Sequence, residues 1–180
     1  MSNFEKTVST EEIYNGKIIV LSRDKVKLQN GKTALREVVH HNGGACVLAL
    51  DDDDNVFLVK QFRYPFNVEL LELPAGKLEK GENPEHTAIR ELEEECGLKA
   101  TEIKSLGVLY PTVAYCTEII YMYFATKFEP SKQNLDEDEF VDIVKLPLTE
   151  AIKMVINNEI PDAKTQVAIL KVAVLKGISV

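Results

Sequence analysis

Alternating hydrophobic and polar positions predict an antiparallel β-sheet in the first part of the chain. Residues 17–28 (KIIVLSRDKVKL) and 33–41 (TALREVVHH) alternate in this way, and Gln29-Asn30-Gly31-Lys32 joins them. Asn-Gly is a strong hairpin signal because both residues readily adopt the positive φ angles of a tight turn. A lone hairpin is only marginally stable in water, so this sheet needs support from the rest of the chain or from a second copy. We therefore expect residues 1–40 to form a small antiparallel region that takes part in a homodimer.

Residues 41–180 show strand patterns interrupted by helix patterns. Strands are predicted at 45–50, 55–63, from 68 onward, and at 101–110, 118–128 and 140–146, with Asp51–Asp54 as a solvated turn. Helices are predicted over 83–97, 149–157 and 162–176, and the last helix has its apolar positions mostly in the core. This order predicts an α/β (α+β) fold in which helices cover a mixed sheet.

The helix over 83–97 carries signals at both ends. Asn83 can cap it, Pro84 suits the first turn because that position needs no N–H donor, and Gly97 suits a left-handed stop. At about 100° per residue, one arc of this helix is apolar and packs, and the neighbouring arc is acidic. The apolar arc holds Ala88, Ile89, Leu92 and Cys96, and the acidic arc holds Glu91, Glu94 and Glu95.

The acidic arc indicates a metal site. Glu91 and Glu95 are like charges four residues apart, which costs a helix roughly 0.2–0.5 kcal/mol. Carboxylate oxygens are hard ligands, so Mg²⁺ or Mn²⁺ between Glu91, Glu94 and Glu95 would turn the repulsion into attraction. A solvated acidic face is the alternative interpretation.

Composition and charge narrow the classes of function. The chain has 180 residues, 45% hydrophobic and 28% charged, which suits one globular domain with a small appendage. A net charge of −8 argues against a nucleic acid or an anionic membrane as partner. No apolar run approaches the roughly 18 residues of a membrane helix, and the first residues do not resemble a signal peptide. Free thiols are expected at Cys46, Cys96 and Cys116, and together these features indicate a cytoplasmic protein.

The run from Gly76 to Leu98 resembles the Nudix hydrolase family. Gly76, Glu82, Arg90-Glu91-Leu92, Glu94-Glu95 and Gly97-Leu98 match every fixed position of the Nudix box. The resemblance implies an α/β/α sandwich with a mixed sheet, a catalytic domain over 41–180, and hydrolysis of a nucleoside diphosphate linked to another group. It also implies metal ligation by Glu91, Glu94, Glu95 and the backbone carbonyl of Ala75, with Glu82 in the outer shell. Arg90 is expected to orient these glutamates through salt bridges.

Three runs outside the box resemble the ADP-ribose pyrophosphatase subgroup. They are Arg36-Glu37-Val38-Val39, Gln61-Phe62-Arg63 with residues 69–76, and Ile160 to Thr165. The implied reaction is Mg²⁺-dependent cleavage of a nucleoside diphosphate sugar into a nucleoside monophosphate and a sugar phosphate. The implied substrate contacts are Arg36, Glu37, Arg63 and Glu118. An ordinary cross-strand charge pattern is the alternative for Arg36 and Glu37.

The sequence leaves open which residue is the general base and which ring stacks on the nucleobase. The subgroup takes its general base from a late loop, and here Glu137 and Glu139 are the candidates. Aromatic rings able to stack on a base are Tyr14, Tyr64, Phe66 and Tyr115, each of which is also compatible with a core position. Other functions compatible with the chain are a Nudix hydrolase for modified nucleoside triphosphates or dinucleotides, and a non-catalytic nucleotide-binding module.

Overall fold

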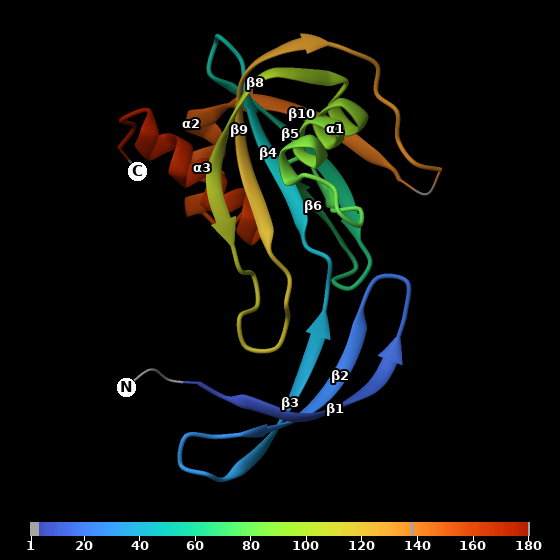
Figure 1. The fold of residues 1–180 in the computed structure, drawn as a ribbon. Coiled ribbons are helices and arrows are strands. Elements are labelled where there is room, and N and C mark those ends of the chain that lie inside the picture. The colour runs from blue at the N-terminus through green and yellow to red at the C-terminus, as the bar shows by residue number, and fades with distance from the viewer. Residues whose placement is uncertain (1–3, 138, 180) are drawn as a thin grey trace. The chain divides into compact units, whose positions relative to one another are not determined.

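The chain folds into two compact units. A computed structural model describes residues 4–137 and 139–179. We call Met1–Gly43 with Tyr110–Ile119 the N-terminal unit, and Gly44–Leu109 with Ile120–Val180 the main unit. Figure 1 shows the elements of each unit.

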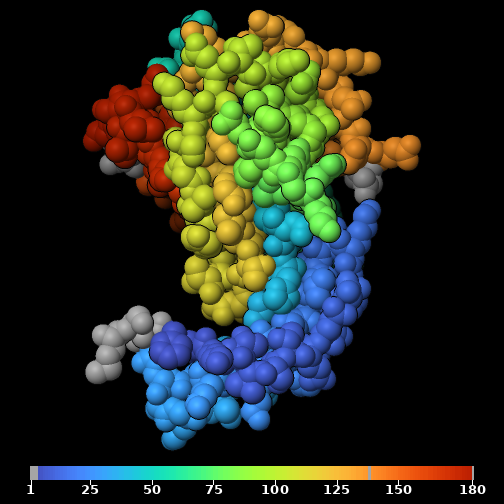
Figure 2. All heavy atoms as spheres, in the orientation of Figure 1, coloured from blue at the N-terminus to red at the C-terminus, as the bar shows by residue number. Residues whose placement is uncertain are grey.

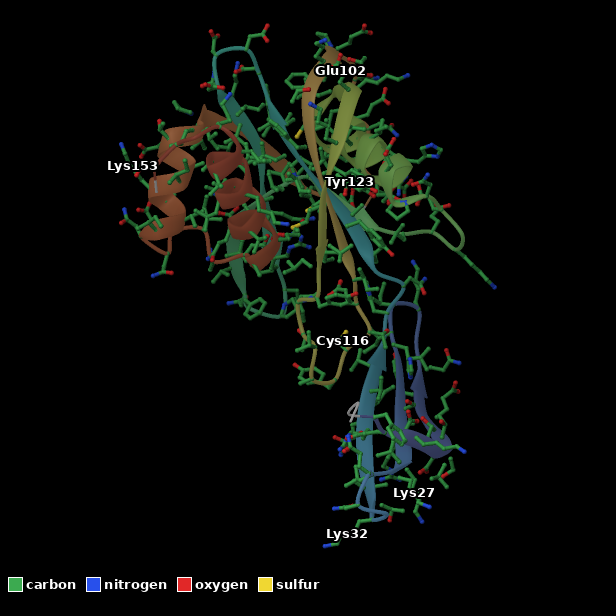
Figure 3. The ribbon with its side chains drawn as sticks, turned by 60° about the vertical axis from the view of Figure 1, so that its left-hand side comes forward. Lys27, Lys32, Glu102, Cys116, Tyr123 and Lys153 are labelled. Atoms are coloured by element: carbon green, nitrogen blue, oxygen red, sulfur yellow. The ribbon has the colours of Figure 1, made fainter. Side chains whose placement is uncertain are left out.

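The N-terminal unit is a three-stranded antiparallel sheet. Its strands are β1 (Lys6–Asn15), β2 (Val20–Lys27) and β3 (Thr33–His40), in the order β1-β2-β3. The predicted hairpin is confirmed, because Lys27 pairs with Thr33 and Gly31 adopts a φ of +80° in the turn. Lys27 and Lys32 mark this end of the unit in Figure 3. The strand β1 was not predicted, and it is exposed along its whole length, so its sequence carries no pattern of alternating burial.

The segment 110–119 also belongs to the N-terminal unit. The backbone N–H of Val39 donates to the carbonyl of Tyr115 at 2.7 Å, and the N–H of Thr117 donates to the carbonyl of Val39 at 2.9 Å. Cys116 lies in this segment, as Figure 3 shows. The last strand of the sheet therefore gains backbone bonds from a segment far away in sequence.

The main unit is built on a seven-stranded mixed sheet. Its strands are β4 (Gly44–Leu50), β5 (Asn55–Arg63), β6 (Val68–Glu72), β7 (Ala75–Lys77), β8 (Leu98–Leu109), β9 (Ile120–Pro130) and β10 (Val141–Pro147). The order is β10-β5-β4-β9-β8, with β6 paired to β5 and β7 paired to β4. Only the pair β4–β9 is parallel among the strand pairs that the structure describes in this sheet.

Helices cover both faces of this sheet, as predicted. α1 (Pro84–Cys96) lies on one face, and α2 (Leu148–Ile156) and α3 (Ala163–Leu175) lie on the other (Figure 1). Alternate residues of β4 supply the two cores: Val47 packs with Ala88 and Leu92 of α1, whereas Leu48 packs in the core beneath α2 and α3. Because β4 is buried on both faces, its sequence is a continuous apolar run.

Two smaller expectations are also confirmed. Asp51–Asp54 forms a turn in which the Asp51 carboxylate accepts the backbone N–H groups of Asp53 and Asn55. The cysteines form no disulfide within the described residues, and burial raises the pKa of Cys46 and Cys96 to about 12. Among residues 4–137 and 139–179, no helix is both long enough and apolar enough to cross a membrane.

Candidate active site

The helix α1 begins and ends where the sequence predicts. The side chain of Asn83 accepts the backbone N–H of Glu85 at 2.9 Å, and Pro84 follows as the first helical residue. Gly97 ends the helix with a φ of +63°, and its N–H donates to the carbonyl of Glu93 at 2.9 Å. These two caps fix where the helix begins and ends, and the packing of Ala88 and Leu92 with Val47 fixes which side faces the sheet. Figure 2 shows the outer side of α1, in light green, uncovered on this face.

Glu91 and Glu95 lie on the inner side of α1 and are buried. Glu95 accepts the backbone N–H of Ala75 at 2.9 Å, which joins the helix to the start of β7. The carboxylate of Glu91 lies against Gly76, where an added Cβ would stand only 1.8 Å from Oε1 of Glu91. A side chain at position 76 would therefore displace the Glu91 carboxylate.

Arg90 holds three of the acidic side chains together. Its Nη1 donates to Glu91 at 2.7 Å and to Glu94 at 2.9 Å, and its Nε donates to Glu82 at 3.2 Å. The salt bridges expected of Arg90 are thus present. The described part of the chain holds no group of three or more Asp, Glu, His or Cys side chains that could bind a metal ion in this arrangement. The ligand roles of Glu82, Glu91, Glu94, Glu95 and Ala75 stay predictions.

The buried glutamates carry an unfavourable charge. Burial raises the pKa of Glu91 to about 7, although the positive charge of Arg90 acts to lower it. Burial also raises the pKa of Glu95 to about 8, against the N–H bond from Ala75, and the negative charge of Glu91 adds to the rise. A cation nearby would lower both pKa values by favouring the charged forms. Hard carboxylate oxygens in this setting fit a divalent cation.

Glu139 acts on the same two glutamates. After burial and the nearer partners, its negative charge contributes to the raised pKa of both Glu91 and Glu95. Glu137, the other candidate base, does not appear among the main influences on either group. The backbone N–H of Asp136 donates to the Glu139 carboxylate at 3.4 Å. The structure therefore brings Glu139 near the acidic cluster.

The segment from Ser131 to Asn134, which leads to the loop that carries Glu137 and Glu139, is bonded to the end of α1. The N–H of Ser131 donates to the carbonyl of Gly97 at 2.7 Å, and the N–H of Asn134 donates to that of Glu94 at 2.9 Å. The side-chain amide of Gln133 donates to the carbonyl of Glu95 at 2.8 Å. The last carbonyls of a helix have no donors within the helix, and this segment supplies those donors. A cavity of about 390 Å³ lies between α1 and this segment, lined by His86, Ile89, Arg90, Glu93, Glu94, Lys132 and Asn134.

Arg63 at the end of β5 is held by Glu72, which the sequence pattern did not predict as a site residue. Its Nε and Nη2 donate to the two carboxylate oxygens of Glu72 at 2.5 and 2.7 Å. Burial opposes the charge on Glu72, but the bonds from Arg63 and Lys164 keep the pKa of Glu72 below its usual value. A sequence signal existed, because Glu72 and Lys164 lie within two of the runs that resemble the subgroup.

Comparisons with known proteins identify the family. The NUDIX domain model matches residues 40–166, which include the whole arrangement of α1, Glu72 and Arg63. The chain belongs to the Nudix family. A second model, the nucleoside diphosphate sugar hydrolase N-terminal domain, matches residues 5–39 of this Nudix chain.

Relatives and a solved structure agree with this assignment. An ADP-ribose pyrophosphatase from Bacillus subtilis (strain 168) is 44% identical over 167 residues, covering 92% of this chain and 90% of its own. A methanol dehydrogenase activator from Bacillus methanolicus is 42% identical over 168 residues, with coverage of 92% and 90%. A crystal structure of an ADP compounds hydrolase has a TM-score of 0.83 at 21% identity, covers 96% of this chain and 95% of its own, and shows the shared fold. The protein is a Nudix hydrolase, and enzymes of this family generally need divalent cations.

The other candidates for substrate binding in this Nudix chain lie in the N-terminal unit. Arg36 bonds to Glu5 at 2.6 Å and pairs in the sheet with Asp24, while Glu37 pairs with Arg23. This is the cross-strand charge pattern of the alternative interpretation, and contact with a substrate stays a prediction.

Glu118 lies beside a histidine, and the candidate aromatic rings lie on the surface. Glu118 lies 3.4 Å from Nδ1 of His41. Tyr14, Tyr64, Phe66 and Tyr115 are all exposed, so none of them is a core residue.

Proposed function

We propose that this Nudix hydrolase cleaves the diphosphate of ADP-ribose or a related nucleoside diphosphate sugar, with Mg²⁺ as the metal. The products would be a nucleoside monophosphate and a sugar phosphate. The observation that carries the proposal is the pair of buried carboxylates, Glu91 and Glu95, whose charged forms a cation beside Ala75 would stabilise. The 44% identical ADP-ribose pyrophosphatase supports the choice of substrate.

Glu91, Glu94, Glu95 and the carbonyl of Ala75 are the groups that would hold the cation, with Glu82 around them. A bound divalent cation neutralises phosphate charge and lowers the pKa of water, which makes the attacking group available near neutral pH. Arg90 keeps Glu82, Glu91 and Glu94 gathered and offsets part of their mutual repulsion. Glu94 is exposed enough to turn toward an incoming ion, whereas Glu91 and Glu95 are held in place.

The chain also supplies groups for proton transfer and phosphate binding. We assign the general base to Glu139, because its charge reaches both buried glutamates, and keep Glu137 as the alternative. Arg63 would bind phosphate oxygens through the part of its guanidinium that does not face Glu72. Arg36, Glu37 and Glu118 are kept as candidate contacts to the nucleoside or the terminal ribose.

A substrate panel tests the proposal. Purified protein is incubated with ADP-ribose, GDP-mannose, a modified nucleoside triphosphate and a dinucleotide, each with Mg²⁺, Mn²⁺ or chelator, and products are resolved by chromatography. We expect AMP and ribose 5-phosphate from ADP-ribose, and no turnover with chelator or with the Glu94→Gln, Glu95→Gln double variant. Release of pyrophosphate from the triphosphate as the fastest reaction would favour the other Nudix specificity. Binding without hydrolysis of any compound would favour the non-catalytic module.

A further inference from the structure

Four charged side chains form one compact group beneath the box. Arg63 bonds to both carboxylate oxygens of Glu72, and Lys164 donates to Glu72 and, at 3.0 Å, to Asp162. The side chain of Glu72 is 2% exposed and that of Lys164 is 12% exposed, whereas that of Arg63 is 37% exposed. The group is therefore buried at its lysine end and open at its arginine end.

The same turn of α3 also holds the backbone next to Glu72. The N–H of Leu73 donates to the hydroxyl of Thr165 at 2.8 Å, and that hydroxyl donates to Asp162 at 2.6 Å. Asp162 also caps α3 by accepting the N–H of Thr165 at 3.0 Å. The start of α3 thus fixes both the side chain of Glu72 and the chain just after it. Ala75, two residues after Leu73, bonds to Glu95.

Burial opposes the charge on Lys164, but Asp162 and Glu72 more than offset this cost, so the pKa of Lys164 is raised. Glu72 already has a two-bond partner in Arg63, and removing a lysine from water carries a large desolvation cost. Lys164 adds a second fixed bond to the carboxylate of Glu72, and this carboxylate orients the guanidinium of Arg63. It also adds a positive charge, so the four side chains sum to zero with Lys164 and to −1 without it. In the described residues, Nη1 of Arg63 has no protein partner, and it remains available at the open end.

We propose that Lys164 is a positioning residue that fixes Glu72 and, through Glu72, presents Nη1 of Arg63 to a phosphate of the substrate. This inference rests on the proposed function, because it takes the substrate to be a nucleoside diphosphate sugar. Loss of Lys164 leaves a net negative charge and a looser guanidinium where the anionic diphosphate binds. Substrate affinity then falls, while the groups that carry out the chemistry on α1 are unchanged.

The test compares Lys164→Met with a matched variant on the same helix. Lys171 is an exposed lysine of α3 whose Nζ donates to the carbonyl of Leu106 at 2.5 Å, so Lys171→Met removes a hydrogen-bonded lysine of the same helix away from Arg63. We expect Lys164→Met to raise KM for ADP-ribose by about tenfold or more, with kcat within about threefold of the original. Lys171→Met leaves KM unchanged. Lys164→Arg, which keeps the charge, restores most of the affinity.

A second measurement does not depend on catalysis. The Nε–H resonance of Arg63, assigned by its loss in Arg63→Lys, is followed by ¹⁵N NMR in each variant. We expect a sharp, slowly exchanging signal in the original protein and in Lys171→Met, and a broadened signal in Lys164→Met. If Lys164→Met does not fold, Lys164→Gln takes its place, because the amide keeps a donor and removes only the charge.

The outcomes separate this inference from the proposed function. A protein that hydrolyses no nucleoside diphosphate sugar refutes the function, and the Arg63 resonance then decides the positioning role by itself. An active protein in which Lys164→Met keeps both its KM and its Arg63 resonance overturns the inference. A fall in kcat and thermal stability at constant KM also overturns it, because that pattern reports a merely structural lysine.

Discussion

At the scale of single residues, Glu91 and Glu95 dominate the site, because their surroundings differ from those of the other acidic residues. Glu91 and Glu95 are buried, and their charged forms are opposed by burial and by neighbouring carboxylates. Burying a charge is costly even where an ion pair offsets part of the cost, as Arg90 does for Glu91. Under the proposed function this arrangement has a use, since carboxylates that repel one another would attract a divalent cation strongly.

This arrangement predicts how stability depends on pH in the presence of chelator. Burial raises the pKa of Glu95 from 4.5 to about 8, so its contribution is fully present below pH 4.5 and is lost as the pH rises through 8. Glu95→Gln removes this loss and still accepts the N–H of Ala75. We expect the variant to gain about 1–3 kcal/mol in free energy of unfolding at pH 8.5, and much less at pH 5.5. Urea unfolding at both pH values measures it, with the exposed Glu129→Gln as control. An equal effect at both pH values would contradict the prediction.

Mg²⁺ should reverse the order of stability of the same two proteins. A cation that binds only the folded state raises the melting temperature, and it binds the deprotonated carboxylates. We expect the original protein to gain more from Mg²⁺ at pH 8.5 than at pH 5.5, and Glu95→Gln to gain little at either. Thermal unfolding over a Mg²⁺ titration is the measurement. An identical Mg²⁺ response in both proteins would remove Glu95 from the metal site.

The two candidate bases can be separated by single substitutions. Glu139 lies near the cluster, whereas Glu137 has no comparable effect on Glu91 or Glu95. We expect Glu139→Gln to lower kcat by about 10²–10⁴ and Glu137→Gln to change it only a few-fold. Steady-state kinetics with ADP-ribose and saturating Mg²⁺ decides the assignment, and the opposite ranking would transfer the role to Glu137.

Residue types and spacing predicted part of this site. Helix periodicity placed Glu91, Glu94 and Glu95 on one arc, and the resemblance of the run from Gly76 to Leu98 added Arg90. The same reasoning could not find Glu72 or Lys164, which are 92 residues apart and meet only after β6 and α3 pack. A buried ion pair has no local signature in sequence.

At the scale of elements, the end of α1 is shared with the segment after β9. Gly97 adopts a left-handed conformation, and an added Cβ would stand 3.0 Å from the carbonyl oxygen of Ser131. Gly177, just beyond α3, also has a positive φ, but apart from its chain neighbours no atom of the described residues lies within 4 Å of its Cβ position. The two glycines therefore separate the cost of backbone conformation from the cost of crowding.

Alanine at each position tests this reading. We expect Gly177→Ala to cost about 1 kcal/mol in stability from its conformation. Gly97→Ala should cost about 1–2 kcal/mol more, because Ser131 and Gln133 must also move. Denaturant unfolding compares the two variants. Equal costs would show that the segment after β9 adapts freely to the end of α1.

Elements with strong local signals were the predictable ones. Capping at Asn83 and Gly97 gave the bounds of α1, and Asn30-Gly31 gave the hairpin between β2 and β3. The strands β1 and β7 were missed for different reasons. β1 is exposed throughout and has no alternation to detect, and β7 has only three residues, defined by pairing with β4.

At the scale of the whole molecule, β1 presents an unusual edge. It lies at the end of its sheet, so one row of its backbone groups is unpaired within the sheet. The regular pairing with β2 shifts around Val8 and Ile13, and both side chains are exposed. Open edges and exposed apolar residues are a liability unless another chain covers them.

We therefore expect a homodimer that uses β1. Replacing Val8 and Ile13 together by glutamate places like charges on both copies of this edge, so the pair should separate into monomers at micromolar concentration. Light scattering after gel filtration measures the mass, and Val174→Glu on the exposed side of α3 is the control, because it adds the same charge away from β1. The melting temperature of the original protein should also rise with concentration, since dimers are favoured by mass action. A monomeric original protein, or a double variant that remains dimeric, would rule out this edge as the interface.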